Sequence, residues 1–234
     1  MDSTKDYHII RELGEAVREN ALTALAQSLP TDTAVLVANT LSYGGRRFGI
    51  LPENLPEGTH LVDRQGTPLV TQVIDVGTLI EVPALQPYSV GALRAIAGDA
   101  STTGSSISAV EDNHQIVLEN ILLRVEINLS GDITRIFDKQ ADREVLPAGT
   151  MANTLQAFED RPMNFDAWDI DIFYEDRTEK VEGVESITIT ERGSLRVAVS
   201  IQRKYRSSTI HQTILLYRDS RRICLLYTSP SPRD

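Results

Sequence analysis

The chain has 234 residues, of which 41% are hydrophobic and 24% charged, and its formal net charge is −10 at pH 7. A chain of this length can bury a substantial core, whereas its acidity argues against a nucleic-acid partner, which requires a basic surface. The single cysteine, Cys224, excludes an internal disulfide and a zinc site built on several thiolates. No apolar run reaches about 18 residues, so we expect no membrane-spanning helix and no membrane partner.

An amphipathic helix is expected over residues 3–28. Ser3 and Asp6 resemble a capping box at its start, and Pro30 marks its end. One helix cannot bury its own apolar stripe, so we expect this one to pack on other helices or on the sheet that follows. The stripe recurs at three- and four-residue steps: Tyr7, Ile10, Leu13, Val17, Ala21, Ala24 and Leu25.

From Thr33 onward the apolar period falls to two, which is typical of strands. Two of the segments flank Arg64–Thr67 and predict a hairpin. Residues 98–109 are small and polar, as in a linker. We therefore expect a helical segment over 1–30, a small β domain over 31–97 and a linker over 98–109. The expected strands are 34–38, 61–63, 69–74, 78–82 and 88–95.

A second β domain is expected over residues 110–223. Apolar and polar residues alternate from Leu123 to Leu129 and again from Leu195 to Gln202, as in half-buried antiparallel strands. Ser207–Ser208 then joins the second segment to a strand over Ile210–Tyr217. We expect a mainly β fold, an antiparallel β-sandwich preceded by a small β domain and one N-terminal amphipathic helix.

The final segment, residues 224–234, differs in its residue pattern from the strand-like segments before it. CLLYTSPSPRD resembles the translation of a transposon adapter used in sequencing libraries; a natural disordered C-terminus is the alternative. The adapter interpretation predicts a truncated chain whose last native residue is near Ile223. It also predicts an unpaired edge on the 195–217 hairpin, with poor solubility or oligomerisation as the result.

An acidic and aromatic stretch, Glu159–Asp176, is the best candidate for a functional loop. It holds seven acids against Arg161 and the adjoining Arg177, together with the sole tryptophan of the chain. Carboxylates accept hydrogen bonds from sugar hydroxyls, and an aromatic face can cover the apolar side of a pyranose. In an extended backbone, two of the acids would share one face and Trp168 the other. The sequence therefore predicts that the stretch Glu159–Asp176 is a carbohydrate-facing loop.

Other interpretations of this stretch remain open. Trp168 could anchor the core under a long loop, with the acids solvated or paired to Arg161 and Arg177. Asp169 and Asp171 offer oxygens at alternate positions, as in a calcium loop, and a carboxylate pair could serve acid–base chemistry. The four histidines are scattered and no catalytic motif occurs, so we assign no catalytic residue and no metal ligand to this chain.

Several segments resemble the C-terminal β region of α-mannosidases of glycoside hydrolase family 38. The longest and most specific of them is Phe158–Asp171, FEDRPMNFDAWDID. The resemblance covers the chain from about residue 3 to Ile223. The further segments that carry it are Leu118–Ile127, Gly131–Lys139, Arg143–Leu146, Ala38–Ser42 and Val82–Tyr88.

The resemblance implies that residues 1–30 hold the last helix of a helical bundle and that the β-sandwich is of the galactose-mutarotase-like supersandwich type. It also implies a retaining exo-enzyme that removes α-linked mannose. It places the nucleophile and a zinc site in an N-terminal barrel that would precede Met1, so no catalytic or zinc residue is carried over to this chain. Asp166, Trp168, Asp169 and Asp171 would face the sugar cleft or brace the interface with that barrel. The implied partners are a mannose-containing glycan and the chain's own missing catalytic barrel.

We therefore expect a fragment that is inactive alone, from a cytoplasmic parent whose native N-terminus is missing. Zinc is expected in the parent and no cofactor in this part. A free-standing carbohydrate-binding β-sandwich module is the alternative function, and a scaffold without a ligand is a third.

Overall fold

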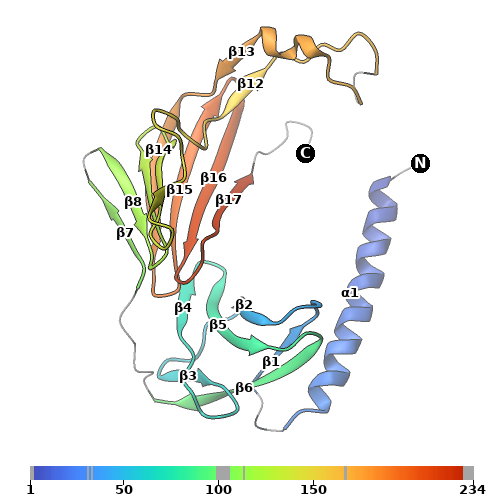
Figure 1. The fold of residues 1–234 in the computed structure, drawn as a ribbon. Helices are drawn as coiled ribbons and strands as arrows, with labels where there is room; N and C mark the ends of the chain where they lie inside the picture. Colours follow the sequence, from blue (N-terminus) through green and yellow to red (C-terminus); the bar gives the residue numbers. More distant parts are fainter. Residues whose placement is uncertain are drawn as a thin grey trace. The chain divides into compact units, whose positions relative to one another are not determined.

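The chain folds into two compact units, Met1–Thr102 and Thr103–Asp234 (Figure 1). Their secondary structure is mainly β, in several antiparallel sheets, which confirms the expected fold class. The division lies inside the range expected as a linker. The computed structural model describes residues 3–30, 32, 34–98, 106–112, 114–165 and 168–228, without the side chains of Arg46 and Arg47.

Helix α1 (Ser3–Gln27) has the expected position, but its apolar stripe is not covered. None of its residues is buried, and Tyr7, Leu13 and Val17 are 72%, 64% and 70% exposed. The expected packing on other helices or on the following sheet is therefore not realised among the described residues. No helix in the described ranges combines the length and the apolar character needed to cross a bilayer.

The first unit contains two three-stranded antiparallel sheets, ordered β1–β6–β3 and β2–β5–β4. Both contribute side chains to one core, so they pack face to face. The core residues are Leu61, Leu69, Ile80, Val82 and Leu93. The strands are β1 (Val35–Asn39), β2 (Gly45–Leu51), β3 (Thr59–Val62), β4 (Thr71–Ile74), β5 (Gly77–Leu85) and β6 (Ser89–Ala97).

The predicted turn at Arg64–Thr67 exists, but it joins strands of different sheets. Asp63 N–H donates to the Thr67 carbonyl at 3.0 Å, and the Asp63 carboxylate accepts from Thr67 N–H at 2.8 Å. Beyond it, an isolated bridge pairs Val62 with Pro68, and Leu69 N–H donates to the Leu61 carbonyl at 2.8 Å. The predicted hairpin therefore forms over this short stretch, after which the chain crosses to the second sheet.

The second unit is an antiparallel β-sandwich. Its two larger sheets run β11–β10–β9–β8–β7 and β14–β15–β16–β17. One core cluster draws on both sheets, with Ile116, Val125 and Ile127 from the first and Ile201 and Ile214 from the second, all 0% exposed. The strands are β7 (Ser108–Glu111), β8 (Gln115–Glu119), β9 (Leu123–Asn128), β10 (Ile133–Asp138), β11 (Arg143–Glu144), β14 (Val184–Arg192), β15 (Arg196–Tyr205), β16 (Ser208–Tyr217) and β17 (Ile223–Thr228).

The predicted alternation holds in β9 but only in part in β15. Leu129, expected to face inward, lies beyond the end of β9 and is 45% exposed. In β15 the supposed outer residues Arg196 and Ala198 are buried as well, so the strand is covered on both faces there. Arg196 tolerates burial because its guanidinium donates to both Glu191 carboxylate oxygens, at 2.6 and 2.8 Å.

The prediction that the 195–217 hairpin has an unpaired edge is wrong. Strand β17 pairs along β16 from Leu216↔Ile223 to His211↔Thr228, and it includes the first five residues of the adapter-like segment. Alternating Leu, Tyr and Thr residues suit a strand, whatever their origin. The strand is an exposed edge, since Leu226 is 56% and Tyr227 is 47% exposed.

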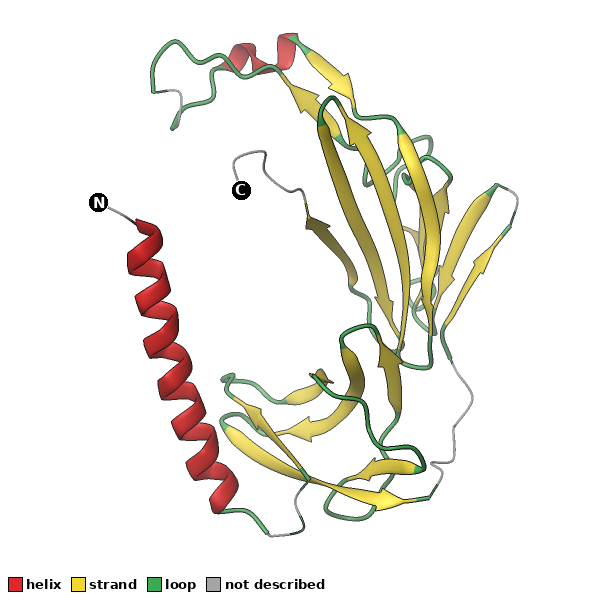
Figure 2. Cartoon of the chain, turned by 180° about the vertical axis from the view of Figure 1, so that it is seen from behind, coloured by secondary structure: helices red, strands yellow, loops and turns green. Residues whose placement is uncertain are grey.

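Strands β12 (Gln156–Phe158) and β13 (Thr178–Lys180) form a two-stranded ribbon at one end of the second unit. Between them the chain makes a long loop that contains the 3-10 helix η1 (Ile172–Asp176). Residues 156–180 are called the arm below. Both ribbon views show the arm at the end of the sheet formed by β14–β17, with its loop extending beyond that end (Figures 1 and 2).

Buried polar contacts fix the root of the arm on the side of β12. Asn153, whose φ is 60°, donates to the Gly131 carbonyl at 2.7 Å and accepts from Gln212. Gln212 is 1% exposed and also accepts from Arg203 Nη1 at 2.8 Å. Arg203, likewise 1% exposed, donates through Nη2 to the Ser130 carbonyl at 2.9 Å. The loop after β9 is thereby connected to β15, β16 and the residues before β12.

The root on the side of β13 is held by an ion pair. Lys180 Nζ lies 2.9 Å from Asp132 Oδ2, and the Asp132 side chain is only 3% exposed. Val181 is buried and its N–H donates to the Leu155 carbonyl at 2.9 Å. Both roots of the arm are therefore anchored in the sandwich, although the arm extends away from its core.

Candidate functional site

The arm presents four side chains on one face of its ribbon. Ala157 pairs with Glu179 in the β12–β13 register, and Glu159 N–H donates to the Arg177 carbonyl at 3.0 Å. Residues two apart on a strand point to the same side, and paired residues share a face. Ala157, Glu159, Arg177 and Glu179 therefore lie together on one surface of the ribbon.

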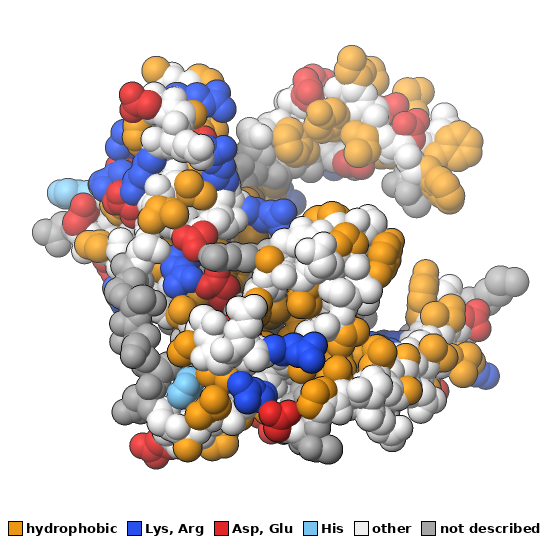
Figure 3. All heavy atoms as spheres, turned by 60° about the horizontal axis from the view of Figure 1, so that its bottom comes forward, with side chains coloured by type: hydrophobic (Ala, Val, Ile, Leu, Met, Phe, Trp, Pro, Cys, Tyr) orange, Lys and Arg blue, Asp and Glu red, His pale blue; other side chains and the backbone are white. Residues whose placement is uncertain are grey.

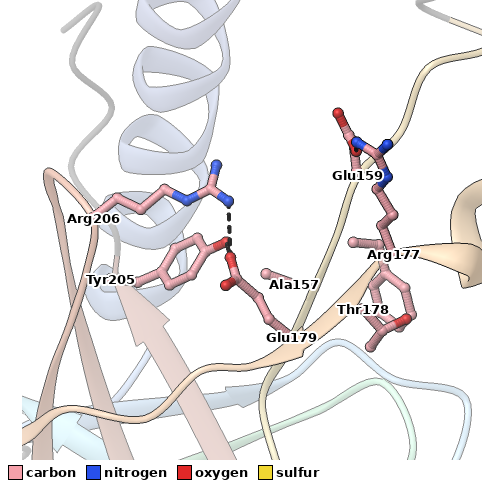
Figure 4. Close-up of a pocket in the computed structure, with 8 residues that line it drawn as sticks. Ala157, Glu159, Arg177, Thr178, Glu179, Tyr205 and Arg206 are labelled. Atoms are coloured by element: carbon pink, nitrogen blue, oxygen red, sulfur yellow. Dashed lines mark hydrogen bonds and ion pairs between the residues drawn. The ribbon is translucent and has the colours of Figure 1, made fainter.

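Tyr205, the last residue of β15, and Arg206, the first residue of the turn to β16, lie beside this face (Figure 4). The Tyr205 hydroxyl donates to Glu179, and Arg206 Nη2 donates to the same oxygen, Oε1, at 2.8 Å. The hydrogen bond from Tyr205, followed by that from Arg206, lowers the pKa of the Glu179 carboxyl. The same bond raises the pKa of the Tyr205 hydroxyl. Glu179 is therefore a carboxylate and Tyr205 a neutral phenol near pH 7.

Two arginines hold Glu159 on the other side of the ribbon face. Arg177 Nη1 lies 2.5 Å from Glu159 Oε2, and Arg161 pairs with Oε1. The hydrogen bond from Arg177, with the charge of Arg161, lowers the pKa of the Glu159 carboxyl. Both guanidiniums are largely exposed, at 79% for Arg161 and 73% for Arg177, so most of their donors face solvent.

A pocket of about 310 Å³ lies between the two charged groups, with Glu179, Tyr205 and Arg206 on one side and Glu159 and Arg177 on the other (Figure 4). The small side chain of Ala157 lies between them, which leaves the middle of the pocket open. A second pocket of about 210 Å³ adjoins the first through Glu159 and Arg177 and reaches η1.

The tip of the arm, residues 163–173, carries a dense set of exposed apolar side chains. A monomer rarely shows so many large apolar groups to water in so short a segment, which marks the tip as a contact surface. Exposed apolar side chains also occur among charged ones elsewhere on the molecule (Figure 3), and they recur along α1. The exposed fractions are 81% for Met163, 76% for Phe165, 92% for Trp168, 65% for Ile170, 78% for Ile172 and 61% for Phe173.

The structure separates the interpretations that the sequence left open. The core-anchor interpretation of Trp168 is wrong, since its side chain is 92% exposed. The backbone is not extended there, because Trp168 N–H and Asp169 N–H both donate to the carbonyl of Phe165, whose φ is 56°. Pairing of the acids with Arg161 and Arg177 is realised by Glu159.

Three of the four predicted site residues lie among the described residues. Asp166 lies outside the described residues. Trp168 and Asp169 are exposed at the arm tip, while the Asp171 carboxylate accepts from Met163 N–H at 2.7 Å and lines the second pocket. No group of three or more His, Cys, Asp or Glu suited to a metal ion occurs in the described ranges.

Sequence reasoning missed Glu179, Tyr205 and Arg206. Glu179 lies three residues beyond the acidic stretch, and the other two lie at a turn 26 and 27 residues further along the chain. The signal that points to them is indirect. A two-residue connection between β15 and β16 places its residues at the end of the sheet, but only the paired β12–β13 register shows that the arm meets them there.

The site can bind but is poorly suited to acid–base catalysis. A general acid at neutral pH needs a carboxyl with a raised pKa, whereas the pKa values of Glu159 and Glu179 are lowered by their partners. Ionised carboxylates next to guanidiniums offer acceptors and donors close together, as recognition of a polar ligand requires.

Comparison with known proteins gives consistent results. Residues 118–228 match the glycosyl hydrolases family 38 C-terminal domain. Alpha-mannosidase 2C1 of Mus musculus is 25% identical over 199 residues, which are 83% of this chain and 17% of the relative. The Homo sapiens protein of that name is 24% identical over 81% of this chain and 17% of the relative. Alpha-mannosidase G of Dictyostelium discoideum is 29% identical over 51% of this chain and 12% of the relative. The chain thus spans about a sixth of the length of the first two relatives.

Proposed function

Because residues 118–228 belong to the C-terminal domain family of the family 38 glycosyl hydrolases, we propose that this chain is the β region of a retaining α-mannosidase. The complete enzyme would remove terminal α-linked mannose from glycans or oligosaccharides. The observation that carries the proposal is the family match, together with three similar proteins that are all α-mannosidases.

The proposed role of the chain within that enzyme is structural support and substrate contact, without catalysis. Retaining glycosidases need one carboxyl that is protonated at the working pH and a second that attacks the sugar. Glu159 and Glu179 are both bound by arginines, which keeps them ionised and hydrogen-bonded. Neither is free to shuttle a proton, so the chemistry is assigned to another domain.

Zinc belongs to that other domain in this proposal. When bound, it would hold sugar hydroxyls and orient the ring. The described residues of this chain offer no group of three or more metal-binding side chains, so they do not fit the ion. This chain would instead contribute contacts around the glycan and to the domain that binds the metal.

The arm tip is the proposed contact with the catalytic domain. Its apolar residues are 61–92% exposed, and burying them against a partner would recover the hydrophobic free energy lost to water. The arm as a whole is acidic, with Asp160, Asp169 and Asp176 exposed. A partner surface with apolar pockets and a basic rim would complement it, and the greater part of the relatives' length is available to provide one.

Hydrolysis of an aryl α-mannoside by the 234-residue chain tests the non-catalytic role. We expect no release of the aryl group above the rate in buffer, with or without added zinc, while an intact α-mannosidase in parallel turns the substrate over. Turnover by this chain would contradict the proposed division of labour. Mannose binding without any stimulation of a catalytic domain would favour the carbohydrate-binding module instead.

A further inference from the structure

The pocket on the ribbon face brings together charged side chains from distant parts of the chain. Its two carboxylates and two guanidiniums come from β13, from the residues next to β12 and β13, and from the β15–β16 turn, segments that are about 20 to 50 residues apart in sequence. The arm roots that hold these segments in place are buried and hydrogen-bonded through Asn153 and Lys180. Almost any side chain larger than that of Ala157 would fill the middle of the pocket.

The hydrogen-bonding groups of the pocket suit a neutral polyol. Arg177 and Arg206 each contact one carboxylate and are 73% and 75% exposed, so further N–H groups remain available. Glu159 and Glu179 keep lone pairs that can accept from hydroxyls. An anion would meet these two carboxylates on the same face, whereas a hydroxyl can donate to a carboxylate and accept from a guanidinium at once.

The volume and the lining residues of the pocket further restrict the class of ligand that it can hold. Its volume of about 310 Å³ lies at the small end of ligand pockets, which run from about 300 to 1,000 Å³, so it holds one ring and not a long oligosaccharide. Ala157 and the ring of Tyr205 give it apolar surface for C–H groups. The Arg206 guanidinium lies 5.1 Å from the centroid of that ring, which holds both side chains at the rim.

We propose that the pocket formed by Ala157, Glu159, Arg177, Glu179, Tyr205 and Arg206 is a sugar-binding subsite that takes one neutral hexose unit of the glycan. This inference rests on the proposed function for the identity of the glycan. It places the sugar at the base of the arm, away from the residues at the arm tip that the sequence favoured. The subsite would hold a part of the substrate that is not cleaved.

Titration of the 234-residue chain with methyl α-mannoside, followed by saturation-transfer NMR, tests the subsite. A single hexose in such a pocket should bind with a Kd on the order of 1–10 mM. Ala157→Leu fills the pocket and should weaken binding by at least about tenfold, a factor that corresponds to about 1.4 kcal/mol. Ala97→Leu, the same change at an exposed position of β6, is the matched control and should leave Kd unchanged.

Glu179→Gln provides a second variant that does not depend on how the arm tolerates a larger side chain. Glu179 is half exposed, so this substitution preserves folding while it removes a charged acceptor, and it should weaken binding about tenfold. Unchanged affinity in both Ala157→Leu and Glu179→Gln overturns the proposal. Loss of binding in Trp168→Ala, with binding retained in Ala157→Leu, overturns it too, because the sugar would then sit at the arm tip.

A panel of methyl α-mannoside, α-galactoside and α-glucoside separates this inference from the proposed function. Pocket-dependent binding of the galactoside alone would support the subsite and count against a mannosidase. Absence of binding by all three glycosides at 50 mM, about fivefold above the weakest expected Kd, would overturn the subsite. Mannosidase activity of a complete enzyme that contains this chain would then still support the proposed function.

Discussion

Gly131 is the position at which one added methyl group should most clearly disturb the anchoring of the arm. Its φ is 75°, and a Cβ atom there would lie 2.3 Å from Nη2 and 3.0 Å from Cζ of Arg203. The Arg203 guanidinium is buried and donates through Nη2 to the Ser130 carbonyl, so it cannot move without losing that bond. Gly131→Ala should therefore destabilise the second unit strongly.

The magnitude follows from two contributions. A left-handed backbone conformation costs alanine about 1–2 kcal/mol relative to glycine. Loss of a buried hydrogen bond from a charged group adds about 1.5–3 kcal/mol. We expect Gly131→Ala to lower the free energy of unfolding by about 3–5 kcal/mol.

Gly149→Ala is a matched control in the same unit. Gly149 has nearly the same φ, 77°, but an added Cβ would meet nothing within 4 Å. It should cost only the backbone contribution, about 1–2 kcal/mol. Urea unfolding of both variants, followed by far-UV circular dichroism, measures the difference. Equal losses in the two variants would refute the assignment of Arg203 as a fixed, buried anchor.

Three further predictions concern other parts of the chain. Asn120 is 2% exposed and donates to two backbone carbonyls, which a carboxylate in its place would repel. Asn120→Asp should therefore lower the free energy of unfolding by about 2–4 kcal/mol in the same urea assay. A loss under about 0.5 kcal/mol would contradict this prediction. The hydrogen bond from Lys139 lowers the pKa of Glu119, so this pair stabilises the fold above the ordinary glutamate pKa, and the stabilisation is lost as the pH falls through the lowered pKa. Glu119→Gln should therefore lower the free energy of unfolding at pH 7 but match the parent chain near about pH 2. An equal loss at both pH values would argue against the pair. Leu13→Ser with Val17→Ser should reduce self-association in light scattering because both side chains are exposed on α1, and an unchanged mass would show that the stripe is not the contact.

Much of the fold could be predicted from periodicity because burial follows it closely in some segments. In β9, Leu123, Val125 and Ile127 are buried and alternate with Arg124 and Glu126, so the pattern gives both the strand and its inner face. Helix α1 was predicted from the spacing of its stripe alone, since none of its residues is buried.

Other elements were not predictable because their residues carry weak local signals. Strand β2 reads GRRFGIL, in which two glycines and two arginines hide its pairing with β5. In β15 the alternation of residues predicts that Arg196 faces outward. It is buried instead because it pairs with Glu191 across the β14–β15 connection. Such burial comes from tertiary partners and not from the alternation of residues.

The candidate site was only partly visible in the sequence. The Glu159–Asp176 stretch was recognised from its acids and aromatics, and it does form the projecting arm with its exposed tip. The pocket at the base of the arm depends on the register Ala157↔Glu179 and on a turn that brings Tyr205 to Glu179. Neither follows from local composition, because both are set by pairing between distant segments.

The most direct test of the proposed role is a chimaera in which this chain replaces the aligned region of mouse Alpha-mannosidase 2C1. A matching β region should support the catalytic domain, so we predict that the folded chimaera hydrolyses an aryl α-mannoside. Replacing the exposed arm-tip residues Trp168 and Phe173 by alanine should then reduce its kcat. A chimaera that elutes as a folded protein but has no activity, with the parent enzyme active beside it, would contradict the account.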